Sequence, residues 1–217
     1  MVSKKDEDVE ETKMTKTIIT CDCMQPQVIP IWKKTWDQLK KDHPKLKVNV
    51  FVVPYWKELP ENDVFRNKDF EKWYEERKDW VEIGQMGYHY LNQLECLRFK
   101  NPQYAYLRRG YRKVGCFMPK DIYCFKPPKQ RMNEHTLPIL RSLGFSACIY
   151  NKEIIMLRKT EKPLNEYIMV ETSINIDSRS PDNINLLQTN FNNYFTKVEQ
   201  EGNEYITASE LIRGALN

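Results

Sequence analysis

The sequence predicts an α/β fold built on a mostly parallel sheet or barrel. Short β-branched or apolar runs alternate along the chain with longer amphipathic segments, which is typical of βαβ units. The run from Val48 to Val53 is almost entirely Val and Phe, as expected of a parallel strand covered on both faces. The 217 residues fit one domain with a proper core. We expect that domain to span residues 17–217, after a charged, disordered tail over residues 1–16.

The elements follow from local patterns in chain order. Strands are predicted where short runs are rich in β-branched, apolar or aromatic residues, over residues 15–22, 46–54, 80–85, 121–128, 145–150, 153–158 and 166–173. Helices are predicted where apolar residues recur at helical spacing or where caps and stops bound a segment, over residues 29–44, 67–80, 101–117, 133–145 and about 193–200. Residues 203–216 predict a closing strand and a terminal helix.

Composition argues against several classes of protein. The formal charge of +4 is slight and spread along the chain, which gives no case for a nucleic-acid partner. No apolar stretch approaches the roughly 18 residues that a membrane span needs, so no membrane partner is expected. The charged N-terminal segment lacks a secretory apolar region, so we expect a cytoplasmic protein. Six cysteines without a CxxC motif then predict reduced thiols. Nothing in the sequence indicates an oligomeric state.

Four predicted strand ends are rich in polar, aromatic or turn-forming residues. They are Asp22–Cys23, residues 54–56, residues 85–90 and residues 126–128. In parallel α/β folds, sites lie at the carboxyl ends of the strands. These four segments are therefore the place to look for a site.

Taken in order, these segments resemble motifs of the polysaccharide deacetylase (NodB-type carbohydrate esterase) family. The matches cover nearly the whole chain from Thr17 onward. They are TCDC at 20–23 for T-[FYL]-D-D, VNVFVVP at 48–54 for the second strand, EIGQMGYHY at 82–90 for E-I-[GA]-x-H-[STG]-x-x-H, FKPP at 125–128 with LGF at 143–145, LLQTN at 186–190 for L-L-x-[TSH]-H, and YITASEL at 205–211. The resemblance implies a distorted (β/α) barrel. It also implies a divalent metal, held by one Asp and two His, that activates water against an N- or O-acetyl group on a sugar.

The departures from these motifs matter more than the matches. The family's metal-binding Asp falls on Cys23, and its two metal-binding His fall on Met86 and Tyr90. Its late His, the usual general acid, falls on Asn190, whereas the general-base Asp is kept as Asp22. Divalent metals of this kind prefer carboxylate oxygen and imidazole nitrogen, so we expect no metal cofactor. The resemblance then implies a retained fold with a dismantled catalytic centre.

Such a pseudoenzyme would keep a pocket for a saccharide, an acylated small molecule or a partner. Tyr55, Trp56 and Tyr88 are candidates for stacking on sugar, although they could equally pack the barrel rim. Lys126, followed by Pro127, would orient Asp22 or a ligand carboxylate, as the family's Arg or Lys does at that place, or would extend along the surface.

Two rival interpretations and one basic surface stay open from the sequence. An active hydrolase would deacetylate sugars with Zn on a shifted ligand set of Asp22, Cys23 and His89. A soft-metal protein would hold Cu(I) on Cys23, Met86 and His89. A basic helical face is made by Arg108, Arg109, Arg112 and Lys113; it is either solvated or docks an acidic glycan or partner.

Overall fold

The computed structural model describes residues 15–90, 95–173 and 181–216. Residues 1–14 of the expected tail therefore lie outside the described residues. The first strand begins at Lys16, inside the run over residues 15–22 that the sequence predicts as a strand. No helix in the described ranges is both long and apolar enough to cross a membrane.

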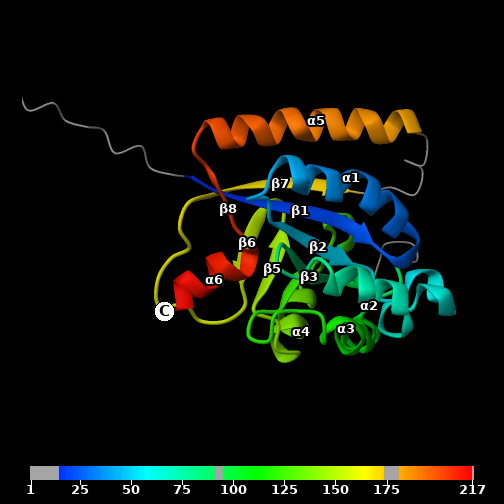
Figure 1. Ribbon diagram of the computed structural model, residues 1–217. Coiled ribbons are helices and arrows are strands. Elements are labelled where there is room, and N and C mark those ends of the chain that lie inside the picture. The colour runs from blue at the N-terminus through cyan, green and yellow to red at the C-terminus, as the bar shows by residue number, and fades with distance from the viewer. Residues whose placement is uncertain (1–14, 91–94, 174–180, 217) are drawn as a thin grey trace, which may run out of the picture.

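The described strands form a mixed sheet that nearly closes into a barrel (Figure 1). They are β1 (Lys16–Met24), β2 (Val48–Val52), β3 (Val81–Met86), β4 (Cys124–Lys126), β5 (Ala147–Tyr150), β6 (Glu153–Met156), β7 (Tyr167–Ser173) and β8 (Glu204–Tyr205). The order across the sheet is β6-β5-β4-β3-β2-β1-β7, and β8 pairs with the start of β1. All of these pairings are parallel except that of β5 with β6, which is antiparallel. The predicted α/β barrel is thereby confirmed.

Helices cover the outside of this sheet and one end of the barrel. They are α1 (Ile29–Asp42), α2 (Lys68–Glu75), α3 (Lys100–Val114), α4 (Thr136–Ser142), α5 (Pro181–Gln200) and α6 (Ala208–Leu216). In Figure 1, α5 lies along α1, and α6 lies at the end of the barrel where β1 begins. The helix expected at about 193–200 starts at Pro181 instead, so the segment 186–190 is helical.

The core has two parts, because successive strand residues point to opposite faces of the sheet. Ile19 belongs to the part between the sheet and the helices, where Trp32 stacks on Trp36 at 5.1 Å. Ile18 belongs to the part inside the barrel, which Leu211 of α6 helps to fill. A filled interior places any site at the rim of the barrel, where the strands end.

The sheet has two edges, β6 and β7, that no backbone ladder joins. We call the gap between them the seam. Near the start of β7, the backbone N–H of Ile154 donates a hydrogen bond across the seam to the Tyr167 hydroxyl, at 2.8 Å.

Candidate functional site

The end of β1 is irregular, and the irregularity sets the site. Cys21 pairs with Val50 and Met24 pairs with Val52, so β1 carries one more residue than β2 over this stretch. Such an extra residue is a bulge, which redirects side chains. Cys23 has φ +62°, a left-handed conformation that few non-glycine residues adopt. The bulge lies where Asp22 and Cys23 leave the regular strand.

Cys23 meets two side chains from the end of β3. Its Sγ lies 3.9 Å from Met86 Sδ and 3.4 Å from the Tyr90 hydroxyl. These are the three positions that the family resemblance assigns to metal ligands. The structure therefore brings the three together, as the motif resemblance requires.

The loop after β3 is held by a buried carboxylate that the sequence did not single out. Glu95 is fully buried, and its Oε1 accepts from the backbone N–H groups of His89 and Tyr90, at 3.2 and 2.5 Å. His89 Nδ1 lies 3.4 Å from the same oxygen, and its ring packs edge-on against Tyr106 at 4.8 Å. Burial lowers the pKa of His89, against the opposing effect of Glu95. One ring nitrogen of His89 is thus directed to Glu95.

Lys126, at the end of β4, is the electrostatic centre of the site. It is fully buried, and its Nζ lies 2.8 Å from Asp22 Oδ1 and 2.8 Å from Glu171 Oε1. It also donates to the Thr20 hydroxyl at 3.2 Å. The expectation that Lys126 orients Asp22 is consistent with this geometry. The alternative, an extended surface lysine, is wrong because the ammonium is enclosed by its two carboxylates.

Glu171 is the second residue that sequence reasoning missed. It lies on β7, directly opposite Thr20 of β1, and its Oε1 also accepts from Gln130 Nε2 at 2.7 Å. Gln130 follows the double proline and accepts in turn from the backbone N–H of Asn151, at 3.1 Å. An acidic residue near the end of a predicted strand was the available signal. Its partner could be known only once β7 was placed beside β1.

Burial governs the protonation of the site. It raises the pKa of Asp22, outweighing the opposing effect of Lys126. Burial also raises the pKa of Cys23 to about 11, although the Tyr90 hydroxyl lowers it somewhat. The Cys23 thiol is therefore protonated at neutral pH and is a poor nucleophile.

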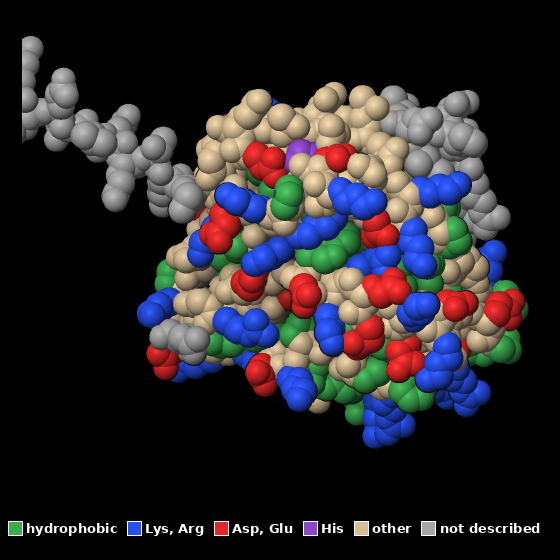
Figure 2. Space-filling model, viewed as in Figure 1, with side chains coloured by type: hydrophobic (Ala, Val, Ile, Leu, Met, Phe, Trp, Pro, Cys, Tyr) green, Lys and Arg blue, Asp and Glu red, His purple; other side chains and the backbone are tan. Residues whose placement is uncertain are grey.

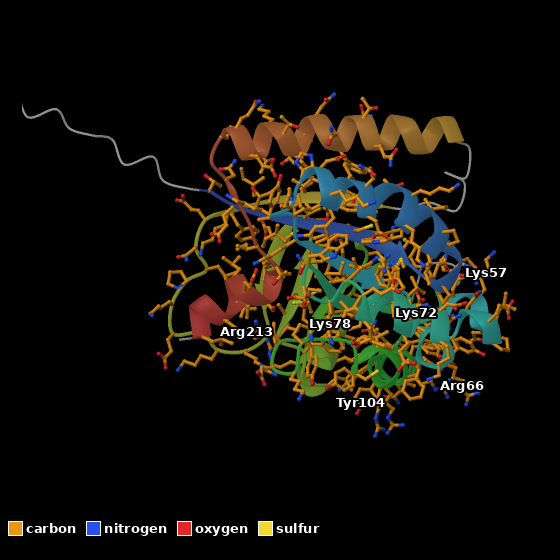
Figure 3. The ribbon with its side chains drawn as sticks, viewed as in Figure 1. Lys57, Arg66, Lys72, Lys78, Tyr104 and Arg213 are labelled. Carbon is orange, nitrogen blue, oxygen red and sulfur yellow. The ribbon has the colours of Figure 1, made fainter. Side chains whose placement is uncertain are left out.

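Aromatic side chains border these polar groups. Trp56 stacks on Tyr90 with ring centroids 5.1 Å apart and planes 27° apart, and Tyr55 packs edge-on against Tyr88 at 6.0 Å. Tyr55, Trp56 and Tyr90 are half-buried, whereas Tyr88 is buried. Lys57, labelled in Figure 3, follows Trp56 in the loop after β2. Pro127, the remaining residue predicted to contact a ligand, follows Lys126 in sequence and is buried.

Asn190 does not join the site. It is exposed on α5, a helix that packs outside the sheet against α1, where Gln188 Nε2 donates to the Lys34 carbonyl at 2.5 Å. Among the described residues no contact links Asn190 to Asp22 or Lys126. The motif match over residues 186–190 assigned Asn190 to the position of the general-acid His. The structure places Asn190 on the exposed surface of α5 instead.

Comparisons with known proteins bear on the fold. No family model matches the chain, and no curated protein sequence matches it. Among solved structures it is similar to a CE4 family pseudoenzyme from Bacillus anthracis, with TM-score 0.60 and 13% identity over 93% of this chain and 66% of that one. A mutant of that pseudoenzyme gives 0.59 and 14%, over 93% and 68%. The 4-alpha-glucanotransferase from Thermococcus litoralis gives 0.53 and 12%, over 93% and 38%.

These likenesses establish the fold. The chain has the deacetylase-type (β/α) barrel of the CE4 pseudoenzyme, and it spans about two thirds of that protein's length. At such identities the comparisons carry no conclusion about chemistry. What the site can do rests on its own residues.

A divalent metal of the kind that this fold family implies does not fit these residues. The three converging groups are a protonated thiol, a thioether and a phenol, which are poor donors for zinc and for harder ions. Across the described parts of the chain, no three His, Cys, Asp or Glu side chains are grouped so as to hold a metal ion. His89, the third member of the shifted set with Asp22 and Cys23, has its Nδ1 3.4 Å from Glu95 Oε1.

Proposed function

We propose that this protein is a catalytically inactive relative of the polysaccharide deacetylases that binds a saccharide. The binding would occur at the carboxyl ends of the strands, in what we call the strand-end site: the polar groups of Asp22, Lys126 and Glu171 with the bordering aromatic side chains of Tyr55, Trp56, Tyr88 and Tyr90. The observation that carries the proposal is that Cys23 contacts both Met86 and Tyr90 at the three ligand positions. The Cys23 sulfur contacts the Met86 sulfur and the Tyr90 hydroxyl, so sulfur and phenol groups occupy the place where a metal ion would be bound.

Loss of the metal removes the step on which hydrolysis depends. A bound zinc ion brings the pKa of its water from about 15.7 toward about 7 and polarises the carbonyl. Asp22 remains, but its carboxylate is ion-paired to Lys126 at 2.8 Å and has only unactivated water to act on. We therefore expect binding without turnover.

The remaining groups suit a sugar. Trp56 and Tyr90 present a stacked aromatic pair, and aromatic faces hold the C–H faces of sugar rings. The partly exposed carboxylates of Asp22 and Glu171 offer fixed acceptors for hydroxyl groups, because Lys126 holds both. A neutral oligosaccharide is therefore the ligand class that we would test first.

Metal content and acetate release test the loss of activity. We expect purified protein to hold no stoichiometric Zn, Ni or Co and to release no acetate from N-acetylated oligosaccharides. The variant Cys23→Asp/Met86→His/Tyr90→His should gain zinc affinity, since the three positions converge. The matched control Cys116→Asp/Tyr104→His places the same ligand types at exposed sites and should gain none. One tightly bound ion in the unaltered protein, with turnover lost in Asp22→Ala, would overturn the proposal.

Binding is tested separately by titrating chito-oligosaccharide while following tryptophan fluorescence or NMR shifts. Trp56→Ala should abolish binding, whereas Phe65→Ala, which truncates an exposed aromatic outside the stacked pair, should not. Equal affinity of the two variants would argue against the strand-end site.

One observation also favours copper as a second candidate. The sulfur atoms of Cys23 and Met86 lie 3.9 Å apart, and both are soft ligands of the kind that Cu(I) takes. The third predicted ligand, His89, is held at Glu95, which leaves two sulfurs. Stoichiometric Cu(I) binding that Cys23→Ser abolishes would favour this candidate over the saccharide site.

A further inference from the structure

Helix α3 carries a strongly basic outer face. Between Lys100 and Val114 it contains five Lys or Arg residues and no acidic residue. Tyr104, Arg108 and Arg112 follow one another at four-residue spacing, so they lie along one side of the helix, and Arg109 lies beside them. All four side chains are exposed. Figure 2 shows Lys and Arg side chains projecting from the lower edge of the molecule, where Figure 1 places α3.

Several basic residues elsewhere on the surface have acidic partners, whereas these three arginines do not. Lys68 pairs with Glu71 at 2.7 Å, and Lys197 lies 3.7 Å from Glu201. Other such pairs are Lys47–Glu210, Arg66–Asp63, Arg77–Asp37, Arg77–Glu76 and Lys78–Glu75. On α3 itself, Lys113 pairs with Asp63. In the described parts of the chain no acidic side chain lies within ion-pair distance of Arg108, Arg109 or Arg112. The α3 face therefore presents uncompensated positive charge.

The basic face is continuous with the aromatic border of the strand-end site. Lys113, on the same helix, has its Nζ 4.7 Å from the centre of the Tyr55 ring. Tyr106 packs against Tyr88 at 5.7 Å and against His89 at 4.8 Å. A chain leaving the site past Tyr55 and Tyr88 would therefore reach α3.

Exposed aromatic and apolar side chains lie at the start of the helix. Phe99 is 85% exposed, Leu97 is 41% exposed and Tyr104 is 37% exposed. Arg98 lies over the Tyr106 ring at 5.2 Å. Leu97, Arg98 and Phe99 also line a hollow of about 400 Å³. Figure 3 labels Tyr104 at the lower edge of the view, on the outer side of α3. This surface thus combines guanidinium groups with aromatic faces.

We propose that this α3 surface binds a carboxylated polysaccharide, which would continue outward from the strand-end site. The inference rests on the proposed saccharide function. Guanidinium groups bind carboxylates through paired hydrogen bonds, which favours arginine over lysine at such a surface. Exposed aromatic rings supply stacking faces for the sugar rings between the carboxylates. The total charge of +4 is small for a nucleic-acid-binding protein, so a sugar polymer fits the chain better.

The test measures binding of polygalacturonate to the full chain at low and at physiological salt. The variant Arg108→Gln/Arg109→Gln/Arg112→Gln should lose about tenfold or more in affinity, because three charged contacts are removed. The control Lys68→Gln/Lys78→Gln/Lys197→Gln removes the same charge from exposed residues of other segments and should bind like the unaltered protein. All of these side chains are exposed, so both variants should fold, as circular dichroism would check.

Other outcomes overturn the inference. Equal losses in both variants would mean general charge attraction, and no binding of polygalacturonate would remove the ligand class. Tighter binding of a single-stranded DNA oligonucleotide, sensitive to the same arginines, would assign the surface to nucleic acid. Neutral chito-oligosaccharide binding, measured on Trp56→Ala and on the arginine variant, reports on the strand-end site alone. The failure of one proposal can therefore be told from the failure of the other.

Discussion

Replacing Lys126 by Met tests the electrostatic centre of the site most directly. Methionine keeps the apolar stem inside the barrel but leaves the carboxylates of Asp22 and Glu171 without their ammonium, which lies 2.8 Å from each in the unaltered protein. Removing one partner of a buried ion pair costs about 3–5 kcal/mol, because the remaining charge stays desolvated. The side chains of Asp22 and Glu171 are 18% and 24% exposed, and Gln130 still donates to Glu171. We therefore expect a loss near about 3 kcal/mol, the lower end of that range.

Urea unfolding at several pH values measures this loss. Burial already raises the pKa of Asp22, and removing Lys126 should raise it further. A carboxyl whose folded-state pKa is raised favours folding below its unfolded pKa, and this contribution is lost as the pH rises. The deficit of Lys126→Met should therefore shrink as the pH falls from neutral toward about 4, near the unfolded pKa of Asp.

A matched control separates burial from charge. Lys47→Met breaks the partly exposed pair with Glu210, and such pairs contribute at most about 1 kcal/mol. Asp22→Asn should also recover part of the loss in a Lys126→Met background, because it removes one of the two unpaired charges. If Lys126→Met costs no more than Lys47→Met, or if its deficit does not change with pH, the two carboxylates do not depend on Lys126 as argued.

Two further predictions concern the backbone and the thiols. Gly87→Ala should destabilise the protein by about 1–3 kcal/mol in urea unfolding, because Gly87 has φ +55° and a Cβ would lie 2.7 Å from Pro128 Cγ. Gly214→Ala should stabilise it by about 0.5–1 kcal/mol in the same assay, because Gly214 lies within helix α6 and an added Cβ would meet nothing within 4 Å. Thiol labelling of the native protein should show one fast-reacting cysteine, the exposed Cys116, and Cys23 should react slowly because burial raises its pKa to about 11. Retention of the fast phase in Cys116→Ser would contradict this.

The strands and most helices could be predicted from the sequence because their patterns are local. The predicted run Val48–Val53 contains the buried strand β2, Val48–Val52, and the Trp32, Trp36 and Leu39 face of α1 is buried as its spacing indicated. Helix α5 was harder to delimit, because Asn-rich sequence has weak helix propensity. Its register depends on tertiary contacts such as Trp36 with Phe191, whose rings lie 5.5 Å apart. The sequence pattern of residues 186–190 carries none of that information.

The site was predictable in part for the same reason. Asp22, Cys23 and Lys126 lie at the ends of strands with clear patterns, and the structure places them together or in contact through shared neighbours. Glu171 was missed because its role comes from pairing with a distant strand. Glu95 lies close in sequence to His89 and Tyr90, but no periodic pattern predicts that its side chain is buried there. Glu171 faces Thr20 through the register of β7 with β1, and Glu95 reaches back to the loop after β3. The local sequence pattern around Glu95 and Glu171 predicts neither of these contacts.

The seam between β6 and β7 makes one junction of this barrel different in kind from the others. Elsewhere, neighbouring strands are joined by backbone groups that every amino acid carries, so substitution rarely removes them. At the seam, side chains make the hydrogen bonds across the gap. The Tyr167 hydroxyl joins β7 to β6, and Gln130 links Glu171 of β7 to the β5–β6 turn at Asn151. A single substitution at the seam can therefore remove a hydrogen bond that holds β6 and β7 together and so alter how the barrel closes. Since Glu171 also contacts Lys126, a substitution at the seam would also affect the site around Lys126.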